Sequence, residues 1–341
     1  MKKRVLISIL SHHLVPNYLF IREMEGLYDE LIFLTTEAML NAKKNNNLEE
    51  ALGLEKESVS CVVLKEDDFS ENLKSLEKAS FSANHSYLVN ITGGTKLMSL
   101  ATLTHFRVFD KATFYYLPIG KNQIHRLDKG STLSISSKLT LKAYFLLYGI
   151  HIDYSEPLGS TFETPNELFR RFQAVSFQRK QLRDIYDADM QPTAEARSFY
   201  LGGWFEEYIY HYLKRTYDVD DDQIACGLEI FREGSTNADN EIDVAMIKDN
   251  SLYIFECKVG LHGNKQAGGF SPTLEKSLYK LAAIAKDFGL QVNSYLLTLH
   301  RIFNNNRLPP ETIANIKKRQ KILGIKEIID HSFFIKDKFK I

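Results

Sequence analysis

Asp243, Glu256 and Lys258 are the residues of this chain whose types and spacing point most directly to chemistry. They lie between Glu241 and Lys258, where two apolar-rich runs flank a Lys-Asp-Asn-Ser segment, a pattern typical of a β-hairpin. Side chains two positions apart on a strand share a face, so Glu256 and Lys258 are expected to point the same way. An acid and an amine that end a strongly apolar strand need partners if they are buried.

Two carboxylates that meet across a hairpin can hold a divalent cation such as Mg²⁺, because hard cations prefer oxygen ligands. A neighbouring lysine can orient or help deprotonate an attacking water, and it can neutralise charge on a phosphate. The alternative is a surface aspartate and a Glu–Lys pair that are solvated or weakly salt-bridged. The motif alone does not decide between these interpretations, because short patterns recur by chance.

The spacing Asp-x12-Glu-x-Lys resembles the motif of the PD-(D/E)XK nuclease superfamily, which includes many restriction endonucleases. Ile242-Asp243 stands where that superfamily usually has its Pro-Asp pair. The resemblance also implies a glutamate early in the helix before the catalytic strands. Glu206 fits that position in the amphipathic helix that starts near Gly202, and Glu207 is its alternative. For either residue, a first-turn glutamate favoured by the helix dipole is the simpler explanation.

The segments after the motif continue the order of that superfamily's core. Ser271–Phe288 has helical periodicity and ends at a glycine, and Gln291–Leu299 is predicted to be a strand. Together with the preceding helix, the sequence predicts helix, three strands, helix and strand. Lys280 on the second helix is interpreted as a solvated surface lysine, with contact to a phosphate as the alternative.

Length and composition set outer bounds. The 341 residues suffice for two domains, and 44% apolar with 25% charged residues is ordinary for a globular protein. The formal net charge of zero gives no overall attraction to nucleic acid. Residues 313–341 are net positive, which is interpreted as a solvated face, with phosphate-backbone contact as the alternative.

The cysteines and the apolar runs argue against a disulfide-linked protein, a zinc protein and a membrane-spanning protein. Three cysteines without paired or metal-ligand spacing indicate neither a disulfide framework nor a zinc site. Cys61 and Cys257 lie in apolar strands and are expected to be small core residues. No apolar run is long enough to span a bilayer, and no signal-peptide pattern follows the first residues. We therefore expect a soluble, cytoplasmic protein with no membrane partner.

The amino-terminal half alternates short β-rich runs with segments of helical period. This alternation predicts βαβ units around a mostly parallel sheet with helices on both faces. In such folds, ligands bind beyond the carboxyl ends of the strands. The expected strands are Val5–Leu10, Leu31–Thr35, Val59–Leu64, Tyr87–Ile91 and Thr113–Leu117, and the expected helices are Leu19–Leu27, Glu37–Leu52, Glu71–Lys78 and Lys96–Phe109.

Two polar loops follow expected strands of this half. The fourth strand is followed by Asn-Ile-Thr-Gly-Gly-Thr-Lys at residues 90–96, and the first by a loop from Ser11 to Asn17. Paired glycines let the backbone approach a ligand closely, and a helix N-terminus offers free N–H groups to an anion. The dinucleotide and NTP fingerprints are absent. The glycine loop is interpreted as a phosphate site, with plain turn chemistry and a Thr95 helix cap as the alternative.

These two loops resemble the CARF domain, a Rossmann-like sensor of cyclic oligoadenylates made by type III CRISPR complexes. A CARF domain followed by a PD-(D/E)XK domain resembles the Card1/Can2 family of CRISPR ancillary nucleases. The expected fold class is therefore α/β, with a CARF domain at residues 1–148, a helical connector at 149–195 and a restriction-endonuclease-like α/β domain at 196–341.

The resemblance implies a homodimer with a symmetric pocket for one ring nucleotide, cyclic tetra-adenylate being the expected form. It implies Mg²⁺ or Mn²⁺ as the catalytic ion, held by Asp243, Glu256 and the carbonyl of Cys257. Ligand binding is carried over to Ser11, Asn17, Thr92, Gly93, Gly94, Thr95 and Lys96, with Thr35 and Thr36 as weaker candidates. Catalysis is carried over to Glu206, Asp243, Glu256 and Lys258.

The expected function is that of a metal-dependent endonuclease of type III CRISPR antiviral defence, activated by cyclic oligoadenylate, that nicks DNA, cleaves single-stranded DNA or RNA, or does both. One alternative is a cyclic-nucleotide-binding regulator whose second domain binds nucleic acid without cleaving it. Another is a nucleotide-dependent oxidoreductase or transferase, which the missing dinucleotide fingerprint disfavours. The sequence leaves open the ring size of the effector, the preference between DNA and RNA, the cut-site sequence and whether the sensor half degrades its activator.

Overall fold

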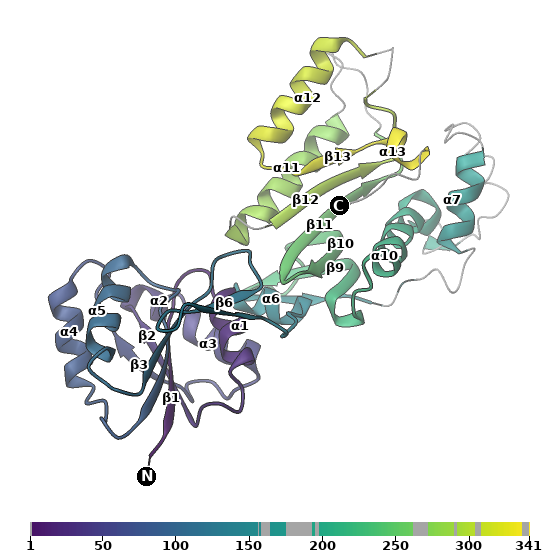
Figure 1. The fold of residues 1–341 in the computed structure, drawn as a ribbon. Coiled ribbons are helices and arrows are strands. Elements are labelled where there is room, and N and C mark those ends of the chain that lie inside the picture. Colours follow the sequence, from purple (N-terminus) through teal and green to yellow (C-terminus); the bar gives the residue numbers. More distant parts are fainter. Residues whose placement is uncertain are drawn as a thin grey trace. The chain divides into compact units, whose positions relative to one another are not determined.

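In a computed structural model, the chain forms two compact units, Met1–His151 and Ile152–Ile341. Each unit is built on its own β-sheet (Figure 1). The structure describes residues 2–155, 157, 164–174, 193–194, 198–261, 272–289, 292–303, 308–335 and 341. Parts of the expected connector at 149–195, and the expected first residues Ser271 and Gln291 of the later helix and strand, lie outside the described residues.

The first unit contains a seven-stranded sheet of order β3-β2-β1-β4-β5-β6-β7. Its strands are β1 (Arg4–Ile9), β2 (Glu30–Thr35), β3 (Ser60–Val63), β4 (Ser86–Asn90), β5 (Ala112–Tyr116), β6 (Gln123–Arg126) and β7 (Ser131–Ser134). The pairs among β1 to β5 are parallel, and β6 and β7 add antiparallel strands at one edge. The chain leaves β1 toward β2 on one side and returns to β4 on the other, so β1 and β4 flank a topological switch point.

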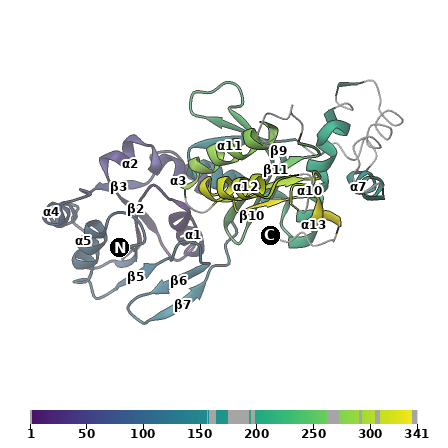
Figure 2. The same ribbon diagram turned by 90° about the horizontal axis from the view of Figure 1, so that it is seen from above.

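Helices cover both faces of this sheet, as the alternating pattern predicted. They are α1 (Val15–Glu23), α2 (Glu37–Asn41), α3 (Lys44–Leu52), α4 (Phe69–Lys78), α5 (Lys96–Phe106) and α6 (Leu141–Leu147). α4 and α5 lie on one face, and α1 and α3 lie on the other (Figures 1 and 2). A buried cluster that includes Ile7, Val89 and Phe106 packs the sheet against α5.

Three details of this unit differ from the sequence-based expectation. The expected helix Glu37–Leu52 is two helices, because Lys43 adopts a left-handed conformation with φ of 53° and interrupts the hydrogen-bond ladder. The strands β6 and β7 and the helix α6 were not expected. Cys61 is exposed rather than part of the core, because β3 is an edge strand whose faces are only partly covered.

The second unit contains a six-stranded sheet of order β13-β12-β11-β10-β9-β8. Its strands are β8 (Ile150–Asp153), β9 (Ile224–Arg232), β10 (Asn240–Lys248), β11 (Ser251–Lys258), β12 (Val292–Thr298) and β13 (Glu327–Ile329). β9, β10 and β11 are antiparallel, whereas β11, β12 and β13 are parallel. The observed succession of α10, β9, β10, β11, α11 and β12 is the order that the sequence predicted.

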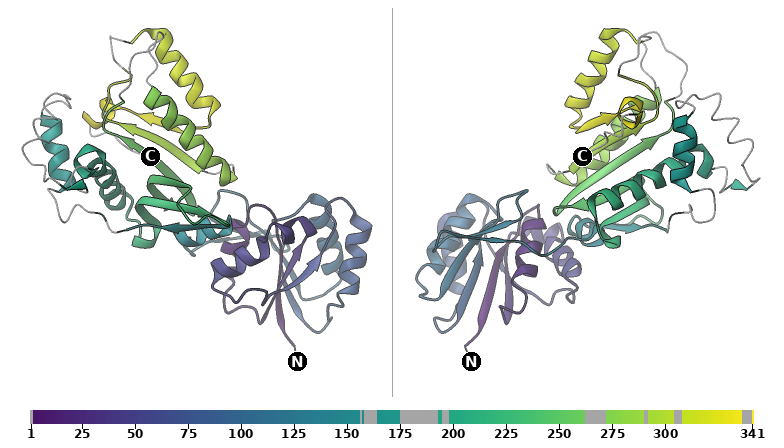
Figure 3. Two further views of the ribbon diagram at one scale, coloured as in Figure 1. Left: turned by 180° about the vertical axis from the view of Figure 1, so that it is seen from behind. Right: turned by 45° about the vertical axis from the view of Figure 1, so that its right-hand side comes forward.

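Helices also cover both faces of the second sheet. They are α7 (Pro165–Ala174), the π-helix η2 (Phe199–Gly203), α10 (Trp204–Tyr217), the short 3₁₀ turn η3 (Asp221–Gln223), α11 (Pro272–Asp287), α12 (Pro310–Ile322) and α13 (His331–Ile335). α7 and α10 lie on one side of the sheet, and α11 and α12 lie on the other (Figure 3). None of the helices in the described ranges is both long and apolar enough to cross a membrane.

The hairpin of β10 and β11 has a two-residue turn at Asp249 and Asn250, whose φ angles are 51° and 57°. Positive φ at both central positions is what a type I′ turn requires, and its twist matches that of the flanking strands. The turn fixes the register so that Val244 pairs with Phe255. The next position along the ladder brings Asp243 beside Glu256.

Candidate functional site

The structure brings together the three residues that the hairpin motif singled out. Lys258 Nζ lies 3.0 Å from Asp243 Oδ2 and 2.8 Å from Glu256 Oε1. Both carboxylates are buried, Asp243 at 5% and Glu256 at 3% exposure. The interpretation of a solvated surface pair is therefore wrong for this hairpin. Two buried carboxylates beside one lysine leave a net negative charge, which requires a further cation.

Lys280 of α11 supplies that cation. Its Nζ lies 2.6 Å from Glu256 Oε2 and 3.3 Å from Asp243 Oδ1. Each carboxylate therefore bridges two ammonium groups, and the cluster of four side chains is formally neutral. The interpretation of Lys280 as a solvated surface lysine is wrong, because its side chain is only 30% exposed. Burial by itself lowers the pKa of Lys280, but Asp243 and Glu256 outweigh this and raise it.

Neighbouring groups fix the orientation of the two carboxylates. The backbone N–H of Cys257 donates a hydrogen bond of 2.7 Å to Asp243 Oδ2, and Ser277 Oγ lies 3.5 Å from Glu256 Oε1. Burial alone lowers the pKa of Lys258, yet the two carboxylates raise it above its ordinary value. Lys258 is thus a cation in this arrangement, suited to neutralising charge rather than to accepting a proton.

Glu206, in the first turn of α10, interacts electrostatically with Asp243, Lys258 and Glu256 of this cluster. Burial, and then the negative charge of Asp243, raise the pKa of Glu206 to about 8, although Lys258 opposes the shift. The neighbouring Glu207 is more deeply buried, at 5% exposure. The first turn of α10 follows the π-helix η2, a feature that is frequent at functional sites and that the sequence did not predict.

The donor set suits a hard divalent cation, provided that water and main-chain oxygen complete the coordination. Among the described residues, no group of three or more His, Cys, Asp or Glu side chains is placed to hold a metal ion. Asp243 and Glu256 nevertheless present two buried carboxylates to one point, and two ammonium groups now balance their charge there. Mg²⁺ commonly binds through one or two carboxylates and keeps several waters, so these residues fit it.

The two polar loops of the first unit meet at the switch point between β1 and β4. A Cβ atom built on Gly93 would lie 2.0 Å from the carbonyl oxygen of Ile9, so only glycine fits there. Gly94 has φ of +72°, and its Cβ would lie 2.6 Å from Ile9 Cγ2. Both glycines are thus required by close contact with the end of β1. The paired glycines were expected to let the backbone approach a ligand closely. In this structure they let it approach Ile9, at the end of β1.

A hydrogen-bond network anchors the two loops to each other. Buried Asn17 donates 2.8 Å hydrogen bonds to Ser8 Oγ and to the carbonyl of Ile9. Asn90 donates to the same Ser8 hydroxyl at 3.2 Å and accepts from both the N–H and the hydroxyl of Thr92. The hydrogen bonds of Asn17 and Thr92 therefore hold the two loops in position.

The remaining predicted ligand residues differ in exposure. Thr95 caps α5 by accepting from the N–H of Met98 and donates to the carbonyl of Glu66 at 2.6 Å. Thr35 is fully buried at the end of β2, and the hydroxyl of the adjacent Thr36 caps α2. Gly94 and Lys96 are exposed, and Ser11 is half-buried. The exposed face of this loop region is thus formed by the backbone at Gly94 together with Lys96 and Ser11.

Comparison with known proteins identifies both halves of the chain. Residues 5–144 match the family model of the Card1 CARF domain. Residues 193–339 match the model of the Card1-like endonuclease domain. In domain composition the chain is a CARF-domain nuclease with a PD-(D/E)XK-type second domain. It belongs to the Card1/Can2 family. No curated protein matches the chain in sequence.

Solved structures share its fold at low sequence identity. Can2 from Sulfobacillus thermosulfidooxidans, solved with cyclic tetra-adenylate, is 20% identical with a TM-score of 0.72, over 98% of this chain and 97% of that one. Protein VC1899 from Vibrio cholerae is 16% identical with a TM-score of 0.75, over 98% and 96%. A type III CRISPR defence DNA nuclease activated by cyclic oligoadenylate is 16% identical with a TM-score of 0.58. The alignment covers 94% of this chain but only 52% of that nuclease.

Proposed function

We propose that this protein is a divalent-metal-dependent endonuclease of type III CRISPR antiviral defence, switched on by a cyclic oligoadenylate. The observation that carries the proposal is the meeting of Asp243, Glu256 and Lys258 at one buried point. It is supported by the family of both domains and by the Can2 structure, which contains cyclic tetra-adenylate.

In the proposed reaction, Asp243 and Glu256 would hold Mg²⁺ or Mn²⁺ together with the carbonyl of Cys257, and Glu206 would lie at the edge of the site. The bound ion would supply Lewis-acid polarisation of the scissile phosphate and stabilise the leaving oxygen. Lys258 orients the attacking water and neutralises charge that develops on the phosphate. The raised pKa of Lys258 supports this cationic role.

The proposed sensor site is the exposed loop face at Ser11, Gly94 and Lys96, with the N-terminus of α5 behind it. Unpaired N–H groups at a helix N-terminus favour an anion, and Lys96 adds a positive charge. Asn17, Thr35, Thr92, Gly93 and Thr95 would shape the loop. The expected ligand is cyclic tetra-adenylate, whose phosphates would lie against this face.

The protein is proposed to act as a homodimer in the cytoplasm. Leu97 and Leu100 on α5 are 36% and 52% exposed beside the proposed sensor loop. Covering these leucines with a second copy would bury apolar surface and bring two loops around one symmetric ring. The three cysteines are free thiols, which fits a reducing compartment.

The proposal is tested by incubating the full-length protein with DNA and RNA, with and without cyclic tetra-adenylate and Mn²⁺. Cleavage of either polymer is expected only when both the ring and the metal ion are present. If the protein bound the ring and the nucleic acid but cut neither polymer under any condition, the regulator alternative would replace the nuclease. If it failed to bind the ring, the sensor assignment would be wrong.

A further inference from the structure

Lys280 of α11 is the only described residue that pairs with two of the four carboxylate oxygens at the site. Asp243 Oδ2 accepts a hydrogen bond from the Cys257 N–H and lies 3.0 Å from Lys258 Nζ. Glu256 Oε1 lies 2.8 Å from the same ammonium group. The other oxygens, Asp243 Oδ1 and Glu256 Oε2, lie 3.3 and 2.6 Å from Lys280 Nζ. Lys280 therefore bridges the carboxylates through the oxygens that Lys258 leaves available.

Lys280 Nζ thus occupies the position that a cation shared by Asp243 and Glu256 would take. A divalent ion bound between these carboxylates needs an oxygen from each of them, and Mg²⁺ and Mn²⁺ take such ligands. Two positive charges at one position repel each other strongly. Lys280 must therefore leave the carboxylates when the ion binds, whereas Lys258 can keep its contacts with the other two oxygens.

The side chain of Lys280 can move without disturbing the core. It is 30% exposed and lies next to the buried stripe of α11 that includes Leu281 and Ile284. Lys276, one helical turn before it, and Tyr279, beside it, are exposed. A lysine has a flexible four-carbon stem, so its ammonium group can change partner while the helix stays in place. Once released, this cation needs water or another anion as its partner.

The charge of the site indicates which anion that is. Without a metal ion, the two carboxylates and the two ammonium groups are formally neutral together. A bound divalent ion leaves the same four side chains with two positive charges in excess. A phosphodiester carries one negative charge, and a second develops when deprotonated water attacks the phosphorus atom. The excess therefore matches the charge of the transition state, and charges placed in advance for that state accelerate the reaction.

We propose that Lys280 is a second catalytic lysine, which leaves Asp243 and Glu256 when the metal ion binds and then contacts a non-bridging oxygen of the scissile phosphate. In the hydrolysis, the water oxygen bonds to phosphorus as the bond to the leaving oxygen breaks. The water gives up a proton to solvent, and the leaving oxygen takes one up. Lys280 keeps its own proton throughout and neutralises charge. The inference rests on the proposed nuclease function and deepens it by adding a substrate contact from α11.

Lys280→Met separates this role from a structural one, because its two expected effects on cleavage have opposite directions. In the ring-activated full-length protein at saturating Mn²⁺, kcat should fall about a hundredfold, as for other groups that stabilise charge in a transition state. The Mn²⁺ concentration for half-maximal cleavage should also fall, about tenfold, because the competing ammonium group is gone. Lys280→Arg keeps the charge and should cleave at least about tenfold faster than Lys280→Met.

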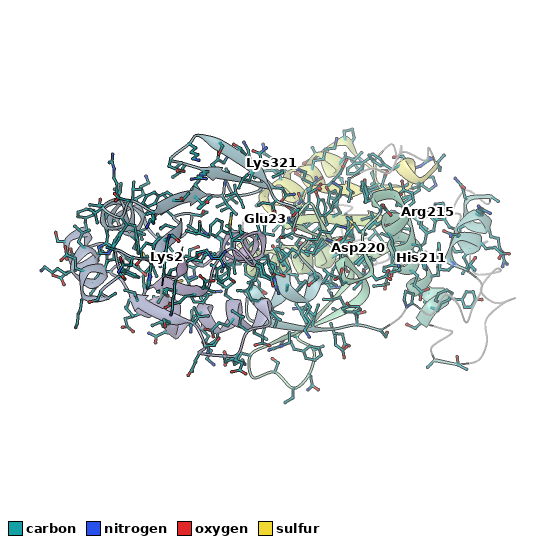
Figure 4. All side chains as sticks on the ribbon, turned by 60° about the horizontal axis from the view of Figure 1, so that its bottom comes forward. Lys2, Glu23, His211, Arg215, Asp220 and Lys321 are labelled. Atoms are coloured by element: carbon teal, nitrogen blue, oxygen red, sulfur yellow. The ribbon has the colours of Figure 1, made fainter. Side chains whose placement is uncertain are left out.

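The phosphate contact is tested without cleavage by fluorescence anisotropy of a labelled oligonucleotide. Ca²⁺ replaces Mn²⁺, and a gel confirms that the oligonucleotide stays intact. Lys280→Met should bind about tenfold more weakly than wild type, because a hydrogen bond between charged groups is lost. Lys321→Met is the matched control, since Lys321 is an exposed lysine of α12 outside the cluster (Figure 4). An equal loss in both variants would indicate diffuse attraction and overturn the phosphate contact.

Two further results would overturn the inference while leaving the nuclease proposal intact. One is a wild-type kcat for Lys280→Met at saturating Mn²⁺, which would make Lys280 a counter-ion only. The other is a joint loss of kcat and of Mn²⁺ affinity, the latter measured by calorimetric titration of the metal-free protein, which would show a structural role. Failure of the nuclease proposal would instead appear as absent cleavage by wild type with both the ring and Mn²⁺, and the Ca²⁺ binding assay would still decide the phosphate contact.

Discussion

Lys280 Nζ lies 2.6 Å from Glu256 Oε2, although the lysine belongs to α11 and the glutamate to β11. The contact places an ammonium group where the two buried carboxylates need a positive charge. Lys258 approaches the other oxygen of Glu256, at 2.8 Å from Oε1. Two lysines therefore supply the same charge as one divalent cation.

Lys280→Met should tighten binding of Mn²⁺ to the full-length protein. Removing the ammonium group lowers the positive potential at the carboxylates, and a gain of about tenfold in affinity corresponds to about 1.4 kcal/mol. The same change should destabilise the metal-free protein by about 2 kcal/mol, because both carboxylates lose a charged hydrogen-bonding partner. Calorimetric titration with Mn²⁺ and urea unfolding in EDTA measure the two effects.

Lys276→Met is the matched control for this prediction, because Lys276 is an exposed lysine on the same helix. It should change neither quantity appreciably. If Lys280→Met left the Mn²⁺ affinity unchanged or weakened it, Lys280 would not be the counter-ion of an exchangeable metal site.

The stability of the metal-free protein should fall as pH rises through the range in which Glu206 titrates. The pKa of Glu206 is raised from 4.5 to about 8, by burial first and then by Asp243. Between those pH values the folded chain keeps a proton on Glu206 that the unfolded chain has lost. This difference stabilises the folded state most at low pH, and the stabilisation is lost as the pH rises to the folded-state pKa.

Glu206→Gln removes the titrating carboxyl group. The free energy of unfolding of this variant should therefore depend less on pH between the two pKa values. Urea unfolding in EDTA at several pH values across this range measures it for both proteins. Glu229→Gln is a suitable control, because Glu229 is exposed on β9. Parallel pH profiles for wild type and Glu206→Gln would show that Glu206 is not protonated at neutral pH in the folded state.

Gly93→Ala should severely destabilise the first unit. The added methyl group would lie 2.0 Å from the Ile9 carbonyl oxygen, and backbone on both sides cannot yield cheaply. We expect a loss of about 3 kcal/mol or more in the free energy of unfolding. Gly26→Ala is the comparison, since Gly26 has φ of +78° but nothing within 4 Å of a Cβ, and should cost about 1 kcal/mol. Similar small losses in both variants would contradict the close contact.

The sequence predicted most strands well because their patterns are local. The hairpin from Asn240 to Lys258 combines apolar alternation with an Asp-Asn turn, and both signals act within a few residues. The two predicted carboxylates met as expected, since the turn fixes the strand register. The break at Lys43 was missed because it depends on one left-handed residue, for which lysine gives no signal.

Lys280 shows the limit of the sequence for the site itself. Its partners Asp243 and Glu256 are distant along the chain, so only the packing of α11 on the sheet brings them together. A signal was present, because Ser277 and Lys280 lie beside the buried stripe of Leu281 and Ile284. A polar residue next to a buried stripe on a helix that covers two carboxylates is a candidate ion-pair partner.

The most direct test of the central claim is cleavage by Asp243→Asn, compared with wild type and with Asp249→Asn in the same hairpin. All three proteins are incubated with single-stranded DNA and RNA, cyclic tetra-adenylate and Mn²⁺. The account predicts that Asp243→Asn loses at least about a thousandfold in rate, near 4 kcal/mol, while still binding the ring. The exposed turn variant Asp249→Asn should cleave like wild type. Cleavage by Asp243→Asn at the wild-type rate would contradict the assignment of the site.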